Sequence, residues 1–393
     1  MSLQPFYRDS WCEVNLDAIQ YNIKQLKQVL SDDTEIFAVV KGNAYGHGDI
    51  QVANAALEEG VYGLAVTLLD EALKLREAGI KAPILVMSWV RPEDVKLAAE
   101  NDITVTVFQK EWVEQAKVHL FNQTLSVHIK IDTGMGRIGI RTLEEMEDLI
   151  KELDDSHFKV TGAFTHFATA DEEDESYYRN QQSRFTECIG MLKSYVKDDN
   201  IVIHSGNSAA SMRYPNDMFD AVRFGISMYG LYPSPFVKQI QPIDLQPAFS
   251  LHSKLIHVKK LPAGEGISYG KTYETQGEEW IGTVPVGYAD GWIRRLHTQH
   301  VIINGKKMPI VGRICMDQFM VRLDGPYPVG EQVTLIGRQG DEEVTVDDIA
   351  DTLETITYEI PCSISYRVPR VYVHNQEIMD VENKLYLEKN RLK

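Results

Sequence analysis

Cysteine is scarce in this chain of 393 residues. The four cysteines are widely spaced and form no CxxC pair; they are Cys12, Cys188, Cys315 and Cys362. This pattern argues against a disulfide framework and against a zinc site, so we predict reduced thiols and no metal centre. Long apolar runs are absent too, since none approaches the ~20 residues that a membrane helix needs. The first residues, MSLQPFYRDSWCEVNLD, carry charges and no apolar signal-peptide core, which predicts a cytoplasmic protein.

Positive charge is also in short supply. Lys and Arg number 40 against 57 for Asp and Glu, which gives a formal net charge of −17. Such a surface repels nucleic-acid phosphates and anionic lipid, so we expect no nucleic-acid partner and no membrane partner. The apolar share of 44% and the charged share of 25% are ordinary globular values. The length suggests two domains, or one barrel with a large appendage.

The first two thirds of the chain alternate short apolar runs with amphipathic segments. The predicted strands are 36–40, 61–66, 84–87, 103–107, 125–131, 160–165, 201–204 and 221–224. Helical spacing marks 16–30, 69–78, 92–100, 111–120, 143–153 and 176–195. Eight such units predict an α/β fold, a (β/α)8 TIM-like barrel over residues 14–243. An open doubly wound sheet stays an alternative, because periodicity cannot show closure.

After about residue 243 the pattern changes to short alternating runs. These runs, at 254–258, 280–286, 301–303, 319–323 and 332–336, predict a mainly β C-terminal domain over residues 244–393, to which residues 1–13 would add a strand. Asn304-Gly305 predicts a hairpin turn. A helix is expected at 346–353 behind Thr345 as its N-cap.

Two motif matches are weak. The GxGxxG match at 134–139 follows a strand, but Arg137 interrupts its glycines and Thr142 with Glu145 predicts a helix that starts beyond the motif. The GxSxG match at 266–270 is followed by a polar segment without a helical face, unlike a nucleophile elbow. A dinucleotide site and a serine hydrolase built on Ser268 are therefore minor alternatives.

A third segment, AVVKGNAYGHG, ends a predicted strand with Lys41 and continues into a loop with three glycines. Lys41 is either a strand-end lysine with its ammonium in water or a nucleophilic amine that forms a Schiff base. Five further polar residues fall at the ends of predicted strands: Arg137, His166, Asn207, Ser208 and Arg223. In a barrel the carboxyl ends of the strands form the catalytic rim, which favours the functional reading of Lys41.

Several segments together resemble the bacterial alanine racemases. They are AVVKGNAYGHG, IDTGMGRIGI, FTHFATADE, GNSAASMR, AVRFGISMYGLYPS, SYGKTYE, VGYADG, GRICMDQFMV and TYEIPCSISYRVPR, in order along the chain. The resemblance implies a pyridoxal 5'-phosphate (PLP) enzyme that works as a homodimer, with active sites shared between the subunits.

The resemblance implies two catalytic bases. Lys41 would hold PLP covalently and then act on one face of the substrate Cα, while Tyr269 of the partner subunit would act on the other face. Racemisation requires bases on both sides of one carbon. The ordinary pKa values, about 10.4 for Lys and about 10 for Tyr, are close enough for a symmetric pair.

The resemblance also implies a set of binding residues. Those for PLP would be Lys41, Tyr45, His166, Asn207, Ser208, Arg223, Gly225, Ile226 and Tyr358. Arg223 would face the pyridine nitrogen and leave it unprotonated, and His166 would bridge Arg223 and Tyr269. Arg137 and the partner's Met316 would receive the substrate carboxylate. Lys130 matches a lysine that is often carbamylated in this family.

The implied activity is interconversion of L-alanine and D-alanine, which supplies D-alanine for peptidoglycan synthesis. Two other PLP functions are weaker alternatives. A non-catalytic PLP carrier would not need Tyr269, Met316 or the second domain. A decarboxylase of related architecture should carry a carboxylate where this chain has Arg223.

Overall fold

The computed structural model describes residues 5–195 and 201–385. Residues 1–4 and 386–393, the outer ends of the predicted second domain, lie outside the described residues. The chain forms two compact units. The barrel unit comprises Ala18–Ala44 and Asp49–Gln246, and the β unit comprises Met1–Asp17, Tyr45–Gly48 and Pro247–Lys393. The boundaries 14–243 and 244–393 stay a prediction.

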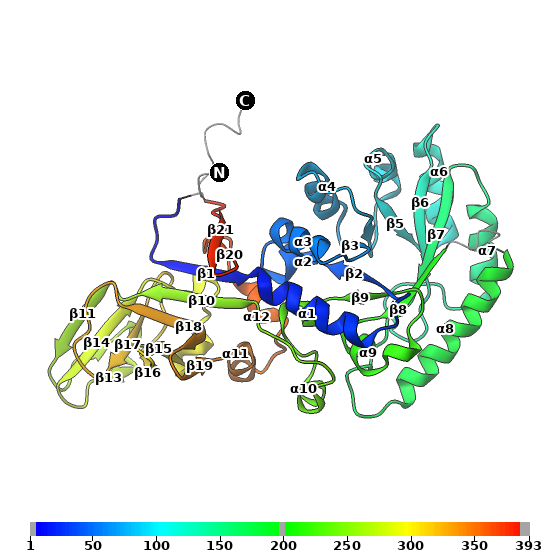
Figure 1. Ribbon diagram of the computed structural model, residues 1–393. Coiled ribbons are helices and arrows are strands. Elements are labelled where there is room, and N and C mark those ends of the chain that lie inside the picture. The colour runs from blue at the N-terminus through cyan, green and yellow to red at the C-terminus, as the bar shows by residue number, and fades with distance from the viewer. Residues whose placement is uncertain (1–4, 196–200, 386–393) are drawn as a thin grey trace. The chain divides into compact units, whose positions relative to one another are not determined.

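The barrel unit contains a closed barrel of parallel strands, as predicted (Figure 1). Its strands are β2 (Glu35–Val39), β3 (Gly63–Val66), β4 (Ile84–Val86), β5 (Thr104–Val107), β6 (Leu125–Lys130), β7 (Phe158–Phe164), β8 (Val202–Gly206) and β9 (Ala221–Phe224). Closure comes from β9, which pairs with β2 in the register Phe37 opposite Arg223. Most residues of these strands are therefore buried on both faces, which explains their largely apolar sequences.

Helices link the barrel strands. They are α1 (Leu16–Val29), α2 (Lys41–Tyr45), α3 (Asp49–Glu58), α4 (Leu69–Glu77), α5 (Val95–Glu100), α6 (Lys110–Leu120), α7 (Leu143–Leu153), α8 (Ser176–Tyr195), α9 (Ser208–Arg213) and α10 (Pro235–Ile240). The predicted capping box is confirmed at α7, where Thr142 accepts the Glu145 N–H and Glu145 accepts the Thr142 N–H. The segment 92–100 is a 3-10 turn, Pro92–Asp94, followed by α5.

The β unit is built on one large sheet with the order β11-β14-β17-β16-β15-β18-β10-β1-β20-β21. Its elements are β1 (Ser10–Asn15), β10 (Phe249–Lys254), β11 (His257–Leu261), β12 (Gly266–Ile267), β13 (Tyr273–Glu274), β14 (Glu279–Val284), β15 (His300–Ile303), β16 (Lys306–Val311), β17 (Phe319–Leu323), β18 (Gln332–Gln339), β19 (Glu342–Val344), α11 (Val346–Leu353), α12 (Glu359–Ser363), β20 (Arg370–His374) and β21 (Glu377–Glu382). The N-terminal strand β1 pairs with both β10 and β20.

One predicted strand of the β unit is wrong. The run 254–258 covers the end of β10, a break, and the start of β11. The break arises because neighbouring residues pair in different directions: Leu255 donates to Glu331 O and Ile256 donates to Thr283 O. The hairpin turn is confirmed, with φ values of 49° at Asn304 and 70° at Gly305.

Within residues 5–195 and 201–385, no helix is long and apolar enough to cross a membrane. The same residues contain no group of three or more His, Cys, Asp or Glu side chains that could hold a metal ion.

Candidate active site

Lys41 begins a left-handed turn directly after β2. Residues Gly42, Asn43, Ala44 and Tyr45 all have positive φ, between 51° and 62°. Each non-glycine residue in this conformation costs roughly 1–2 kcal/mol. Three of these four residues are not glycine, so the chain stores strain immediately beside Lys41. Strain of this kind concentrates where a function requires it.

Arg223, on β9, is the buried centre of the rim. Its Nη2 atom donates to Thr165 O (2.7 Å) and Ser205 O (3.0 Å) and lies 3.3 Å from Nδ1 of His166. Its Nη1 atom donates to Nδ1 of His204 at 2.8 Å. Carbonyl and imidazole acceptors thus fix the guanidinium, and within the described chain it has no carboxylate partner.

Burial determines the protonation of this cluster. Burial, with the Arg137 charge nearby, lowers the pKa of Arg223 to about 9. Burial and the Arg223 charge hold the pKa values of His166 and His204 well below the ordinary value. Both imidazoles are therefore neutral at pH 7, and Arg223 is the cation. Since Arg223 can only donate, Nδ1 of each histidine accepts and Nε2 carries the proton.

Lys130, the last residue of β6, lies in the same region. Its side chain is buried, and Nζ donates to Ile131 O at 2.7 Å. Burial and the Arg223 charge lower the pKa of Lys130 to about 7. A substantial share of this amine is therefore neutral at physiological pH, which is unusual for a lysine.

The ends of β8 and β9 meet around Ser208, the first residue of α9. The Ser208 hydroxyl accepts the N–H of Gly225 at 3.0 Å and that of Ser227 at 3.4 Å. Asn207 caps α9 by accepting the Ala210 N–H. This arrangement brings Asn207, Ser208 and Gly225 together, with Ile226 next to Gly225 in the chain.

Arg137 lies at the exposed tip of the loop 132–139 between β6 and α7. The base of the loop is closed by a bridge between Ile131 and Ile140. Inside it, Asp132 accepts the N–H groups of Gly134 and Gly136 at 3.1 and 3.0 Å. These amides are already used by a carboxylate and α7 starts only at residue 143, so the GxGxxG match is not a phosphate-binding turn.

In the β unit, Tyr269 and Met316 lie on two loops that contact each other. Ser268 donates to Arg313 O at 2.6 Å, and its hydroxyl lies 3.6 Å from Cys315 Sγ. Tyr269 is 71% exposed and Met316 is 53% exposed. Ser268 is followed by a 3-10 turn, Tyr269–Lys271, and not by a long helix, so the nucleophile-elbow reading of GxSxG is wrong.

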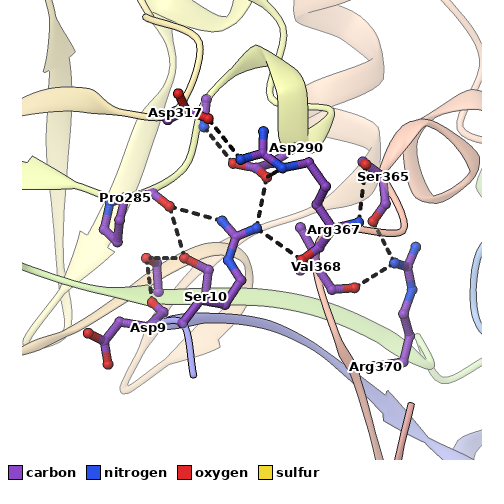
Figure 2. A network of polar contacts seen from close by, with 12 residues as sticks. Asp9, Ser10, Pro285, Asp290, Asp317, Ser365, Arg367, Val368 and Arg370 are labelled. Atoms are coloured by element: carbon purple, nitrogen blue, oxygen red, sulfur yellow. Dashed lines mark hydrogen bonds and ion pairs between the residues drawn. The ribbon is translucent and has the colours of Figure 1, made fainter. Parts of the chain in front are cut away.

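An ion-pair network around one buried carboxylate supports the Met316 loop. Arg8 and Arg367 both form ion pairs with the carboxylate of Asp290, which is 1% exposed. Figure 2 shows Arg367 beside Asp290 and Asp317. Arg367 also donates to Asp317 at 2.9 Å. The turn that contains Asp290 binds Met316 directly, because the Ala289 N–H donates to Met316 O at 3.0 Å. Asp290 and Arg367 were not predicted as functional residues, although they lie within the segments VGYADG and TYEIPCSISYRVPR.

Tyr45 and Tyr358 are neighbours in the β unit. Their ring centroids are 6.2 Å apart. Burial raises the pKa of Tyr45 far above its ordinary value, so its hydroxyl stays protonated. The predicted residues therefore fall into two groups. Lys41, Lys130, Arg137, His166, Asn207, Ser208, Arg223, Gly225 and Ile226 belong to the barrel unit, and Tyr45, Tyr269, Met316 and Tyr358 belong to the β unit.

Family models match both parts of the chain. The model described as "Alanine racemase, N-terminal domain" matches residues 14–233, and "Alanine racemase, C-terminal domain" matches residues 248–372.

Sequence relatives and solved structures point to the same family as the two family models. An alanine racemase of Geobacillus stearothermophilus is 54% identical over 386 residues, 98% of each chain. The crystal structure of alanine racemase from Bacillus anthracis with bound L-Ala-P has a TM-score of 0.94 and 50% identity, and the match covers 97% of this chain and 99% of that one. A histidine racemase from Leuconostoc mesenteroides has a TM-score of 0.85 at 30% identity, and the match covers 95% of this chain and 100% of that one.

Proposed function

This chain belongs to the alanine racemase family, and on that premise we propose that it interconverts L-alanine and D-alanine with PLP as cofactor. We place the activity in the cytoplasm, where the D-alanine would supply peptidoglycan synthesis. The observation that carries the proposal is Arg223, a buried cation fixed at the rim beside the Lys41 turn, the neutral His166 and the amine of Lys130.

The donor set fits PLP. Both Nη atoms of Arg223 are engaged, whereas Nε has no hydrogen-bond partner among the described residues. A fixed donor of this kind suits an acceptor such as an unprotonated pyridine nitrogen. Ser208 offers a hydroxyl and Gly225 and Ile226 offer backbone amides for the phosphate, with Asn207 holding α9 in place. We add Tyr45 and Tyr358 to this phosphate set from the family resemblance.

When bound, PLP would withdraw electron density from the substrate Cα and make its hydrogen acidic. The protein must then move the proton. The Nζ atom of Lys41 would take or return it on one face of Cα, and the Oη atom of Tyr269 of the partner subunit on the other. Because Arg223 remains protonated, it can only donate to the ring nitrogen, which restrains side reactions that a pyridinium would favour.

A homodimer follows from the same roles. Tyr269 and Met316 are exposed side chains held by well-connected loops, so both are available to a second subunit. The partner's Met316, together with Arg137, would bind the substrate carboxylate. The neutral amine of Lys130 could attack CO2, forming an N–C bond with release of one proton, and the resulting carbamate would orient Arg137 by charge.

Racemisation assays with purified protein and PLP test the proposal. We expect rapid interconversion of alanine in both directions, with far slower turnover of serine and histidine, because the relatives that are about half identical are alanine racemases and the histidine racemase is only 30% identical. PLP absorbance without turnover would instead indicate a carrier. Release of CO2 from an amino acid would indicate a decarboxylase.

A further inference from the structure

The amino-terminal end of the barrel, opposite the rim, contains a cavity that the proposed mechanism does not use. Its volume is about 210 Å³. It is lined by Phe37, Tyr62, Lys81, Pro83, Ile84, Leu85, Asp102, Thr104, His128 and Thr161. Drug-sized ligands occupy pockets of ~300–1,000 Å³, so this cavity suits a smaller molecule.

A chain of imidazoles connects Arg223 to this cavity. Arg223 donates to Nδ1 of His204, and Nε2 of His204 lies 2.9 Å from Nδ1 of His128. Because Arg223 can only donate, Nδ1 of His204 accepts and its Nε2–H must donate to Nδ1 of His128. His128 therefore carries its own proton on Nε2. The charge on Arg223 thus fixes the tautomer of His128, a residue that lines the cavity, and makes its Nε2–H a hydrogen-bond donor.

This donor is open to a ligand acceptor. His128 is 4% exposed, and burial together with the Arg223 charge lowers its pKa to about 3, so the ring is neutral. In the described parts of the chain, Nε2 of His128 has no hydrogen-bond partner. This N–H is not among the fully buried side-chain atoms that lack a partner, so it is accessible at the cavity wall, where a ligand oxygen can accept its hydrogen bond.

The other lining residues restrict the acceptor's chemistry. Lys81 and Asp102 offer one cation and one anion on exposed side chains, and the Asp102 charge also acts on Arg76. Phe37, Pro83, Ile84 and Leu85 supply apolar wall, and Thr104 and Thr161 add hydroxyls. A small molecule with one carboxylate, one ammonium and a short apolar part matches this lining.

We propose that the cavity is a second binding site that accepts a small free amino acid. Nε2–H of His128 and the ammonium of Lys81 receive the carboxylate, and Asp102 receives the amino group. Through His204, the bound amino acid also reaches Arg223. Any influence of the bound amino acid on racemisation, through His204 and Arg223, rests on the proposed racemase function. The binding itself does not.

Saturation-transfer NMR on the PLP-loaded protein tests the site, with the active site filled by alanine phosphonate so that added L-alanine reports on the cavity. We expect a saturable L-alanine signal and weaker signals from propionate and ethylamine, which each lack one charged group. Lys81→Met and Asp102→Asn should each weaken alanine binding about two- to fivefold, as expected for partly exposed charge pairs. Lys193→Met, an exposed lysine of α8 outside the cavity, is the matched control.

Three outcomes would overturn the proposal: no alanine signal, a signal unchanged by Lys81→Met, or equal binding of alanine and propionate. The last would show that the site takes simple carboxylates. Failure of the racemisation assay with a Lys81-sensitive alanine signal would refute the proposed function and leave the second site standing. Alanine binding that shifts the Nε2 resonance of His128 would identify the acceptor contact directly.

Discussion

The two ends of the barrel use the same eight strands for different purposes. The carboxyl end carries a strained turn after Lys41, the buried cation Arg223 and the partly deprotonated amine of Lys130. The amino end is mostly apolar strand starts such as Leu125, which is fully buried. In barrel enzymes the first end usually bears the chemistry and the second bears stability. Here the two are joined by His204 and His128, so the separation is incomplete.

Lys41→Ala should produce the largest loss of kcat of these variants, and it tests whether the carboxyl end of the barrel is the catalytic end. Removing the amine takes away both the covalent link to PLP and one base, so we expect kcat to fall at least ~10³-fold. Racemisation rates and the visible spectrum of the PLP-loaded protein measure this. Lys110→Ala, an exposed lysine of the barrel unit, is the control. A near-normal rate in Lys41→Ala would refute the assignment.

Leu125→Ala should show the opposite behaviour at the amino end. The truncation leaves a cavity at the start of β6, and we expect the free energy of unfolding to fall by about 2–5 kcal/mol. The kcat of the folded protein should stay within about twofold of the unmodified protein. Denaturant unfolding followed by assays below the transition measures both quantities. A large drop in kcat without loss of stability would contradict the division of the barrel.

Replacing the histidines tests how far the ends are coupled. His204→Phe removes one acceptor of Arg223, and the net worth of a hydrogen bond to a charged group, about 1.5–3 kcal/mol, predicts roughly a tenfold or greater loss of kcat. His128→Phe should have a smaller effect, because His128 contacts Arg223 only through His204. The kcat and KM of both variants measure this. An equal loss of kcat in the two variants, or a loss of stability without a loss of kcat, would argue against coupling through the series Arg223–His204–His128.

The smallest effect concerns Lys130. Its pKa is lowered to about 7 from an ordinary value of 10.5, so the neutral amine is the minority form below pH 7 and the majority form above it. Carbon NMR with 13C-bicarbonate should therefore show a carbamate signal that grows as the pH rises through about 7. Lys130→Met should lack the signal. A carbamate signal that is strongest at low pH would contradict the lowered pKa of Lys130.

Local patterns predicted much of this fold. Short, largely apolar runs marked the barrel strands, Thr142 with Glu145 marked the start of α7, and Asn304-Gly305 marked a hairpin. The run 254–258 was misread because Leu255 and Ile256 bond to different neighbours, a long-range property with no local sign. The left-handed turn was hidden for a similar reason, since Ala44 and Tyr45 disfavour positive φ and a single tolerant residue, Asn43, does not indicate a run of such residues.

The residues of the candidate site likewise fall into those that local sequence patterns indicate and those that depend on contacts between distant segments. Lys41, His166 and Ser208 could be picked out because each stands at the end of an apolar run. His204 and His128 could not, since a histidine inside a strand gives no sign of its partners until the barrel closes. Asp290 was missed because its partners Arg8 and Arg367 are 282 and 77 positions away in the chain.

The most direct test of the two-base racemase follows loss of the Cα hydrogen in D2O from each alanine enantiomer separately, comparing the protein with Tyr269→Phe. The account predicts that the variant loses exchange mainly from one enantiomer, because Lys41 still serves the opposite face. Equal loss from both enantiomers, or unchanged exchange from both, would contradict it.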